Sequence, residues 1–516
     1  MSVTLTLDGR SVEIPDDGAS LLEALRDRLG ERSPKDGCSP QGQCGCCTVL
    51  IDGQPRVACV TPVRRVAGRA VTTLRGLDPD IRERLVDAFV DHGASQCGFC
   101  TPGIIVRLAS LGPAPEVADV ERALLAHLCR CTGWRSIIDA AVEGPLAGER
   151  DLIAAGRRAT LEGGSHQTVG PDVVRGDAGF ADDLAPAGAL VAVPKPDGGW
   201  AVGATLVEAR TASGKVQGRR TTADLTWPLA LPAGSWDLTL QTTWVEPAYL
   251  EPDASWSEPG GPTAAPLANG GAFGAKVNSV VVAAAEELAA QHGAPVRVVL
   301  AREDVVRLGP KRPPMAIGLR ADGTGVARVA RTPGIAAAIA SVAPGVDVEE
   351  VDVAGPPTSA SIRAAGWAEA AVMVAALGGD VPAVVRAPSG AWASAEISDR
   401  GIEIVVGAGE VLDEVVLRSY CIGAAHQALG WVTSEGLAVD DAGVVHDLTI
   451  RSFGVLRAQD MPRVSVTIAE PGTTEPYPVP LEAVNGSDAA FAAVAAAVWI
   501  NRGLPARWPL DRAPNA

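Results

Sequence analysis

Residues 38–59 read CSPQGQCGCCTVLIDGQPRVAC. Four of these cysteines are spaced Cys38-x5-Cys44-x2-Cys47-x11-Cys59, close to the C-x4-C-x2-C run with a distant fourth cysteine that binds a plant-type [2Fe-2S] cluster. The segments TVLI and RVACV are typical of two strands joined at an Asp-Gly turn. This stretch therefore predicts a β-grasp ferredoxin domain with a cysteine loop.

A second cysteine group follows, so that nine of the ten cysteines lie between Cys38 and Cys131. Its spacing is Cys97-x2-Cys100, then Cys129-x1-Cys131. Each group supplies four thiolates, enough for one all-cysteine cluster, and the simplest count is two clusters. Because the N-terminal residues alternate like a strand and show no export signal, we expect metal ligands in a reducing cytoplasm rather than disulfides.

Composition narrows the class of protein. A length of 516 residues predicts three or four domains. The formal net charge of −17 would repel phosphate backbones, which argues against nucleic acid as a partner. The longest apolar run, near residues 489–500, is too short to span a membrane. Small molecules and other proteins remain as partners.

The first 145 residues divide into two expected domains, 1–76 and 77–145. The first contains a hairpin turning at Asp8-Gly9 and a helix that begins with a capping box of Ser20 and Glu23. The second has helical periodicity: residues 80–91, a helix with Thr101 as N-cap, residues 116–128 and a helix from Ser136. Short helices with paired cysteines at their ends predict a four-helix bundle around a cluster.

Beyond residue 145 the chain becomes rich in Gly, Ala, Val and Pro. Residues 146–168 are expected to form a linker, followed by two lobes at 169–325 and 326–516. Short strands alternate there with Ala-rich helices, expected at 279–291 and 364–376. The fold class is therefore α+β throughout.

The first 145 residues resemble the iron-sulfur subunit of the xanthine oxidase family of molybdenum hydroxylases. The strings that carry the resemblance are GCSPQGQCGCCTVLIDG, QCGFCTPGI and LCRCTGW, at 37–53, 96–104 and 128–134. The resemblance implies one [2Fe-2S] cluster on Cys38, Cys44, Cys47 and Cys59, and another on Cys97, Cys100, Cys129 and Cys131. It also implies that Gln96 contacts the pterin of a molybdenum cofactor.

One further cysteine departs from the family pattern. Cys46 stands where the family commonly has alanine, and Cys38 and Cys44 are separated by five residues instead of four. Cys46 reads as a small buried side chain near the cluster; ligand substitution is the alternative.

The remaining residues resemble a shortened, divergent molybdopterin-binding subunit of the same family. The matching strings are GDAGFADDL, GGAFGAK followed by PVRVVLAREDVV, IRAAGWAEA and LRSYCIGAAHQALGWVTSE. The resemblance implies cofactor contacts from Gly270, Gly271, Phe273, Gly274, Arg363 and Gln427. The glycine loop is not a Walker loop, because Val277 replaces the serine or threonine that would meet magnesium.

Several expected parts of that subunit are missing. Tyr420 stands where many members have a pterin-binding glutamine, and the family's catalytic glutamate has no counterpart in EAVNGSDAAFAAVAAAVW at 482–499. The catalytic base is therefore unknown. Asp488 is a weak candidate and reads more readily as the N-cap of the Ala-rich helix behind it. His426 and Cys421 read as packed helix residues.

Two functions follow from the resemblance. The first is an oxidoreductase like xanthine or aldehyde dehydrogenase, which passes electrons from a substrate at molybdopterin through two [2Fe-2S] clusters to an acceptor. No segment resembles the family's FAD domain, so a flavin would sit on a partner chain. The alternative is a non-catalytic iron-sulfur electron-transfer or assembly subunit whose molybdopterin-like half has lost the cofactor and docks on a complete subunit.

Overall fold

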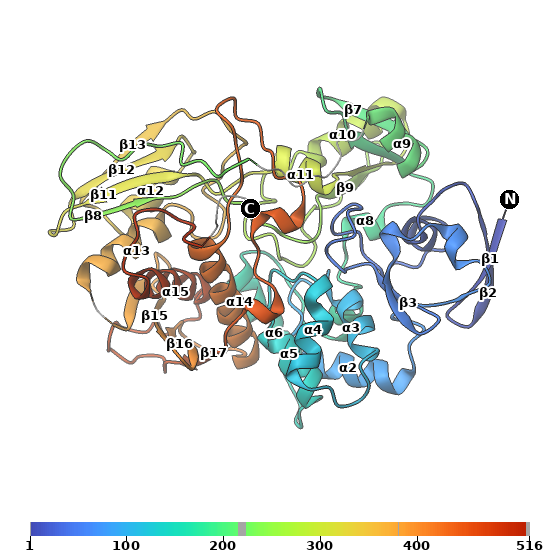
Figure 1. The fold of residues 1–516 in the computed structure, drawn as a ribbon, viewed down its shortest axis with the longest axis horizontal. Coiled ribbons are helices and arrows are strands. Elements are labelled where there is room, and N and C mark those ends of the chain that lie inside the picture. Colours follow the sequence, from blue (N-terminus) through green and yellow to red (C-terminus); the bar gives the residue numbers. More distant parts are fainter. Residues whose placement is uncertain (1, 215–222, 380, 512–516) are drawn as a thin grey trace.

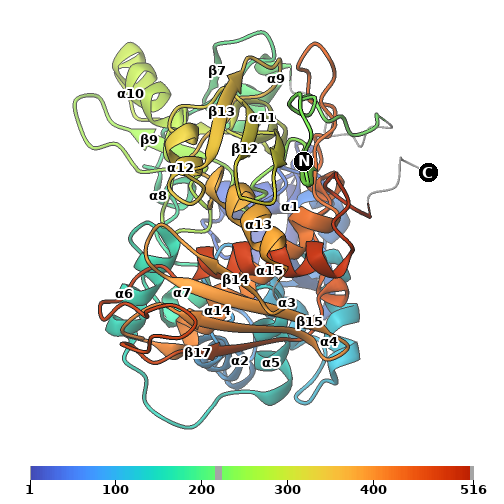
Figure 2. The same cartoon turned by 90° about the vertical axis from the view of Figure 1, so that its left-hand side faces the viewer.

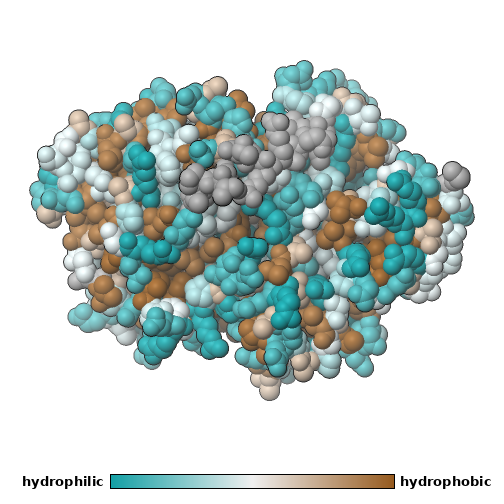
Figure 3. Space-filling model, viewed as in Figure 1, coloured by the Kyte–Doolittle hydropathy of each residue, from teal (hydrophilic) through white to brown (hydrophobic). Residues whose placement is uncertain are grey.

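The computed structural model describes residues 2–214, 223–379 and 381–511. It has the expected α+β architecture, with four β-sheets and helices packed around them. The N-terminal strands lie at the right of the molecule, the helices that follow them lie below its centre, and strands from the middle of the chain share the left side with C-terminal helices and strands (Figure 1). Hydrophobic residues reach the surface in small areas between hydrophilic ones (Figure 3).

The N-terminal domain is a β-grasp fold. Its five strands are β1 (Ser2–Leu7), β2 (Arg10–Pro15), β3 (Thr48–Ile51), β4 (Gln54–Val57) and β5 (Ala70–Thr72), in the order β2-β1-β5-β3-β4. The β1–β2 turn has positive φ at Asp8 (48°) and Gly9 (80°), as the sequence predicts. The Ser20 side chain accepts a hydrogen bond from the Glu23 backbone N–H and begins α1 (Leu21–Glu23), which continues as a π-helical turn (Ala24–Arg28).

Four short helices follow, as predicted. They are α2 (Pro79–Asp91), α3 (Thr101–Ala109), α4 (Val117–Ala123) and α5 (Arg135–Glu143). The N-cap of α3 is Cys100 rather than Thr101, because the helical backbone begins one residue earlier than the Thr-Pro signal indicates. Helix α4 gives way to a 3-10 turn at Leu124–Ala126, short of the expected end at residue 128.

The prediction that residues 146–168 form a linker is wrong. The segment contains α6 (Leu152–Gly163), which packs against the long helix α14 (Glu414–Thr433). Arg158 and Glu162 of α6 are fully buried and form an ion pair with each other. Gly and Ala residues indicate a linker only when their neighbours are solvated, and here they allow close helix packing.

Two further sheets make up the middle of the chain. The first contains β6 (Leu190–Pro194), β7 (Trp200–Gly203), β9 (Ala254–Ser257) and β10 (Val296–Val299). The second contains β8 (Leu238–Gln241), β11 (Met315–Leu319), β12 (Gly325–Ala330) and β13 (Val346–Val351). The helices of this part are α7 (Pro171–Arg175), α8 (Ala181–Leu184), α9 (Leu206–Ser213), α10 (Val281–His292), α11 (Arg302–Leu308) and α12 (Ile335–Ala340).

The second of these sheets corrects the lobe boundary expected at residue 325. Strands β11 and β12 pair antiparallel, with Leu319 opposite Gly325. Residue 325 therefore lies at a hairpin inside one sheet rather than between two lobes. A single sequence shows the turn but not which strands it joins.

The last sheet supports the two longest buried helices. Its strands are β14 (Ala383–Arg386), β15 (Trp392–Ser398), β16 (Gly401–Gly407) and β17 (Val464–Ile468). Helix α15 (Ser487–Asn501) lies across this sheet and packs on both α14 and α13 (Trp367–Gly378) (Figure 2). Among the described residues, no helix is long and apolar enough to cross a membrane.

Candidate functional site: two cysteine sets and the cavity beside them

The first cysteine set gathers around the loop that precedes β3. Cys38, Cys44, Cys47 and Cys59 are all buried, the last in a 3-10 turn after β4. Hydrogen bonds with the thiols of Cys44 and Cys59 hold the pKa of Cys38 well below its ordinary value. The backbone N–H of Gln41 donates to Cys38 Sγ at 3.3 Å, and that of Cys59 donates to Cys47 Sγ at 3.4 Å. These N–H groups would stabilise negative charge on the sulfurs.

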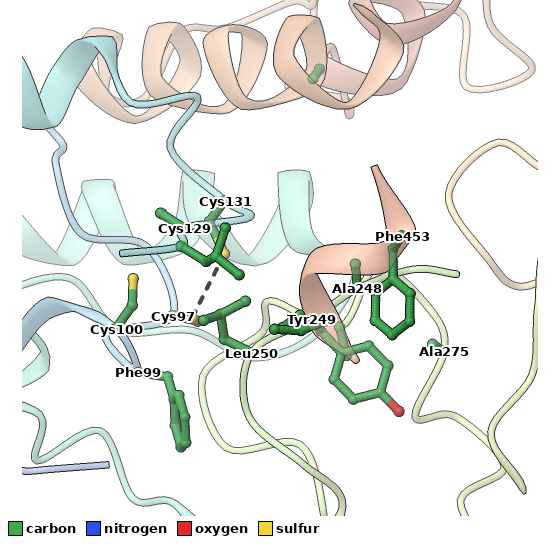
Figure 4. Close-up of a cluster of buried hydrophobic side chains, with 14 of the residues drawn as sticks. Cys97, Phe99, Cys100, Cys129, Cys131, Ala248, Tyr249, Leu250, Ala275 and Phe453 are labelled. Atoms are coloured by element: carbon green, nitrogen blue, oxygen red, sulfur yellow. Dashed lines mark hydrogen bonds between the residues drawn. The ribbon is translucent and has the colours of Figure 1, made fainter. Parts of the chain in front are cut away.

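The second set lies where α3 begins and where the 128–134 loop passes it (Figure 4). Cys97 Sγ and Cys131 Sγ are 3.6 Å apart, and the thiols of Cys100 and Cys129 are hydrogen-bonded to each other. The contact with Cys100 lowers the pKa of Cys129 to about 6. The sequence predicts this grouping, and the structure brings all four side chains together.

The chemistry of both donor sets fits a [2Fe-2S] cluster. Within the described residues, no three His, Cys, Asp or Glu side chains converge as a single-ion site. Four buried cysteines in each set are instead the donors that a binuclear iron-sulfur cluster requires.

The two sets are separated by very little protein. A Cβ added at Gly103 in α3 would lie 2.4 Å from the carbonyl oxygen of Gly45, in the first cysteine loop. Only glycine permits this close approach of backbones. Cys46 lies in the same contact: it is fully buried, burial raises the pKa of its thiol, and its Sγ faces the carbonyl oxygen of Cys44 at 3.9 Å.

Gln96 links the second set to the C-terminal part. Its side-chain amide donates to the carbonyl oxygen of Cys131 (3.1 Å) and to Ser419 Oγ on α14 (3.0 Å). Asn269, just before the glycine loop, donates to the backbone oxygen of Gln96 at 3.1 Å. The predicted pterin contact thus lies beside the glycine loop, but both of its described hydrogen bonds go to protein atoms.

The glycine loop packs closely against protein at each of its three glycines. A Cβ at Gly271 (φ 83°) would lie 2.6 Å from Cys97 Cβ, and one at Gly274 would lie 1.7 Å from the carbonyl oxygen of Ser361. At Gly270 the nearest atoms belong to the Gln167 side chain, whose Oε1 accepts a hydrogen bond from Tyr420. The loop approaches the second cysteine set closely, as a cofactor loop would, yet no open space faces these three glycines.

Arg363 contacts two of the other predicted cofactor residues, Phe273 and Gln427, and the catalytic candidate Asp488. Its Nε donates to Asp488 Oδ1 (2.9 Å), its Nη2 to Ser487 Oγ (2.9 Å) and its Nη1 to Gln427 Oε1 (3.4 Å). Its guanidinium also lies over the Phe273 ring, 5.3 Å from the centroid. Three residues predicted from separate strings therefore converge.

Asp488 is not the N-cap that the sequence predicts. Gly486 is the N-cap of α15, and Asp488 lies inside its first turn, paired with Arg363. Burial raises the pKa of this carboxyl, and Arg363 lowers it in part. An aspartate held in an ion pair is poorly placed to act as a free base.

The space between these residues is too small for a molybdopterin. The cavity lined by Phe273, Arg363 and Gln427 measures about 30 Å³, whereas small-molecule pockets span roughly 300–1,000 Å³. Arg130, Glu435 and Arg312 line it, and all three are held in buried ion pairs, Arg130 with Glu435 and Arg312 with Glu369. A molybdopterin would require these side chains to move apart, so the residues as arranged do not fit it.

Sequence reasoning missed Glu162, which lies in the expected linker. Its carboxylate accepts hydrogen bonds from the backbone N–H groups of Gly486 (3.1 Å) and Ser487 (2.8 Å) at the start of α15. The available signal was the pair Arg158 and Glu162, four residues apart, which suits one face of a helix.

The two side chains read as packed helix residues are buried. Burial lowers the pKa of His426 to about 3, and its Nε2 contacts the Leu456 carbonyl oxygen at 3.0 Å. Burial raises the pKa of the Cys421 thiol.

Comparison with known proteins supports the prediction of two [2Fe-2S] domains in the first 145 residues. A 2Fe-2S iron-sulfur cluster binding domain matches residues 5–64, and a [2Fe-2S] binding domain matches residues 73–142. A probable xanthine dehydrogenase subunit from Bacillus subtilis is 36% identical over 141 residues, covering 27% of this chain and 81% of the relative. The nicotinate dehydrogenase small FeS subunit of Eubacterium barkeri is 35% identical over 142 residues, covering 27% and 90%.

The rest of the chain is supported at the level of fold. An aldehyde oxidoreductase structure from Desulfovibrio gigas superposes with a TM-score of 0.71 over 99% of both chains, at 15% identity. In sequence, the match to the aldehyde oxidoreductase of Megalodesulfovibrio gigas is 40% identical over 147 residues but spans only 16% of that relative's length.

Two cluster domains followed by this fold define an oxidoreductase class that combines iron-sulfur domains with a larger α+β part. The chain belongs to the xanthine oxidase family of molybdenum hydroxylases.

Proposed function

We propose that this chain is an electron-transferring oxidoreductase chain of the molybdenum hydroxylase type, with one [2Fe-2S] cluster on each cysteine set. The observation that carries the proposal is the backbone contact of Gly103 with Gly45, which holds two buried four-cysteine sets next to each other. A [2Fe-2S] cluster accepts and releases a single electron.

The arrangement suggests the direction of flow. The second set lies against the glycine loop and α14 through Gly271 and Gln96, so electrons would arrive there from the C-terminal part or from a substrate-oxidising partner. The first set lies in the β-grasp domain, and electrons would leave from it to a flavin or another acceptor on a different chain.

Reduction of purified protein tests this proposal. We expect about four iron atoms per chain and two distinct [2Fe-2S] signals by EPR after dithionite reduction. A chain that retains fewer than about two iron atoms after anaerobic reconstitution would contradict it.

A second candidate function has a specific observation in its favour. The cavity of about 30 Å³, lined by side chains held in buried ion pairs, supports a non-catalytic electron-transfer or assembly subunit whose molybdopterin-like half docks on a complete subunit. Arg363 and Asp488 would then be structural residues rather than cofactor and catalytic residues.

Metal analysis separates the two candidates. The protein is expressed with and without cofactor-making machinery, and molybdenum, pterin and turnover of an aldehyde and an N-heterocycle are measured. Molybdenum near one per chain together with turnover would establish the catalytic form. Iron without molybdenum or turnover, with the clusters intact by EPR, would establish the second. Asp488→Asn is the matched variant, because it removes the charge and preserves the shape of the side chain.

A further inference from the structure

The strand and loops around Cys59 carry an unusual excess of positive charge. Residues 53–77 contain five arginines and no Asp or Glu, in a chain whose formal net charge is −17. Three of them, Arg56, Arg64 and Arg65, are exposed and here define the arginine patch. The patch stands out because the chain as a whole is acidic.

Neighbouring acidic residues do not neutralise the arginine patch. Asp52 pairs with Arg69 (2.7 Å), and Asp17 pairs with Arg28 (2.7 Å). Within the described parts of the chain, none of the three patch arginines forms an ion pair. Their charges therefore face solvent uncompensated.

An exposed apolar residue between Arg56 and Arg64 in the sequence touches the first cysteine loop. Val60 directly follows Cys59 and is 53% exposed. A Cβ at Gly42, between Cys38 and Cys44, would lie 3.2 Å from Val60 Cγ1. This surface therefore lies directly beside a proposed cluster ligand.

We propose that the arginine patch, together with Val60, docks an acidic one-electron carrier protein; this rests on the proposed function of the first cysteine set. Exposed arginines and one exposed apolar side chain close to a cluster suit a small, short-lived contact of the kind formed by redox partners. Opposite charge raises the rate of encounter without strong binding. In the transfer, one electron leaves the reduced cluster, which is reoxidised, and reduces the carrier by one electron.

The test measures electron transfer from the dithionite-reduced full chain. The protein is mixed by stopped flow with oxidised flavodoxin, an acidic FMN protein, and separately with a basic cytochrome c. We expect Arg64→Glu/Arg65→Glu to lower the bimolecular rate constant with flavodoxin about tenfold at low ionic strength. The same variant should raise the rate with cytochrome c, and both differences should shrink in about 0.5 M salt.

A matched control separates local from global charge. Arg157→Glu/Arg386→Glu changes the net charge equally at two exposed arginines outside the patch. Equal rates for the two double variants would overturn the docking proposal, as would a wild-type rate with flavodoxin that does not fall with salt.

The two proposals fail in different ways. EPR is recorded first on every protein: wild-type chain without clusters overturns the proposed function and docking with it. If the double variant alone loses its first cluster, Arg56→Glu replaces it, and an unchanged rate there overturns docking while the clusters still support the proposed function.

Discussion

The cysteine sets and the Arg363 cavity are both buried, and residues from distant segments meet in both, yet they are filled differently. Around Cys97 and Cys131 the converging groups are thiols, which contact one another, and backbone N–H groups, so the sulfurs have no charged partner and can serve as metal donors. Around Arg363 the converging groups are a guanidinium, a carboxylate, an amide and a ring, which satisfy one another. Convergence alone therefore does not make a binding site; the converging groups must also lack charged partners that already neutralise them.

Removing one thiolate tests most directly whether the second cysteine set, unlike the Arg363 cavity, is a ligand set. We expect Cys131→Ala to lower the iron content from about four to about two atoms per chain and to abolish one of the two EPR signals. Cys421→Ala is the control, because Cys421 is equally buried but belongs to neither set. Retention of both signals in Cys131→Ala would show that the second set is not a ligand set.

The ion pair between Arg130 and Glu435 joins the two regions. Arg130 lies between Cys129 and Cys131, and both partners are almost fully buried, 5% and 1% exposed. Arg130→Met leaves an uncompensated carboxylate, so we expect a loss of about 3–5 kcal/mol in the free energy of unfolding, measured by urea denaturation.

Two controls accompany the Arg130 variant. Arg130→Met/Glu435→Gln should recover most of the loss, since no buried charge remains unpaired. Arg122→Met breaks an exposed pair with Asp119 and should cost about 1 kcal/mol or less. Equal losses for Arg130→Met and Arg122→Met would contradict the buried position of the first pair.

His426 gives the C-terminal part a distinct pH dependence. Burial lowers the pKa of His426 from 6.5 to about 3, so below pH 6.5 the unfolded chain binds a proton that the folded chain does not. The neutral His426 therefore leaves the folded state at its full stability above pH 6.5, and the free energy of unfolding decreases as the pH falls below 6.5. We expect wild type to lose about 2 kcal/mol more than His426→Gln between pH 7 and pH 5. Parallel stability curves for the two proteins over this range would refute the assignment.

The smallest expected effect tests the contact between the glycine loop and the second cysteine set. Gly271→Ala and Gly293→Ala both place a side chain at positive φ, 83° and 61°, but only at Gly271 would the new Cβ meet another atom within 4 Å. We expect Gly271→Ala to cost about 1 kcal/mol more and to shift one EPR signal. Identical effects of the two substitutions would show that the loop does not touch Cys97.

The cysteine sets could be predicted because their information is local. The spacing from Cys38 to Cys59 indicates a cysteine loop followed by a hairpin of two paired strands, and Ser20 with Glu23 indicates a helix start. Phe273, Arg363 and Gln427, named from separate strings, lie together in the structure, and their role as cofactor contacts stays a prediction. The small size of the cavity depends on Arg312, which is held in place by Glu369, a residue far away in the chain. The spacing of residues in one sequence does not show such long-range contacts.

Three of the predictions, the linker, the lobe boundary and the N-cap role of Asp488, failed for the same physical reason. The segment 146–168 has a linker composition, but its helix gains stability from packing against α14 and from the partners of Glu162. The strand pairing across residue 325 and the partner of Asp488 likewise depend on distant neighbours.

Helix α6 changes how the two regions stay together. Two relatives are named as small subunits, and this chain covers 90% of the length of each with its iron-sulfur region. Here α6 is a covalent connection that is itself part of the interface, held by Arg158 and Glu162. Dilution therefore cannot separate the cysteine sets from the C-terminal part, and their ratio remains one to one at any expression level.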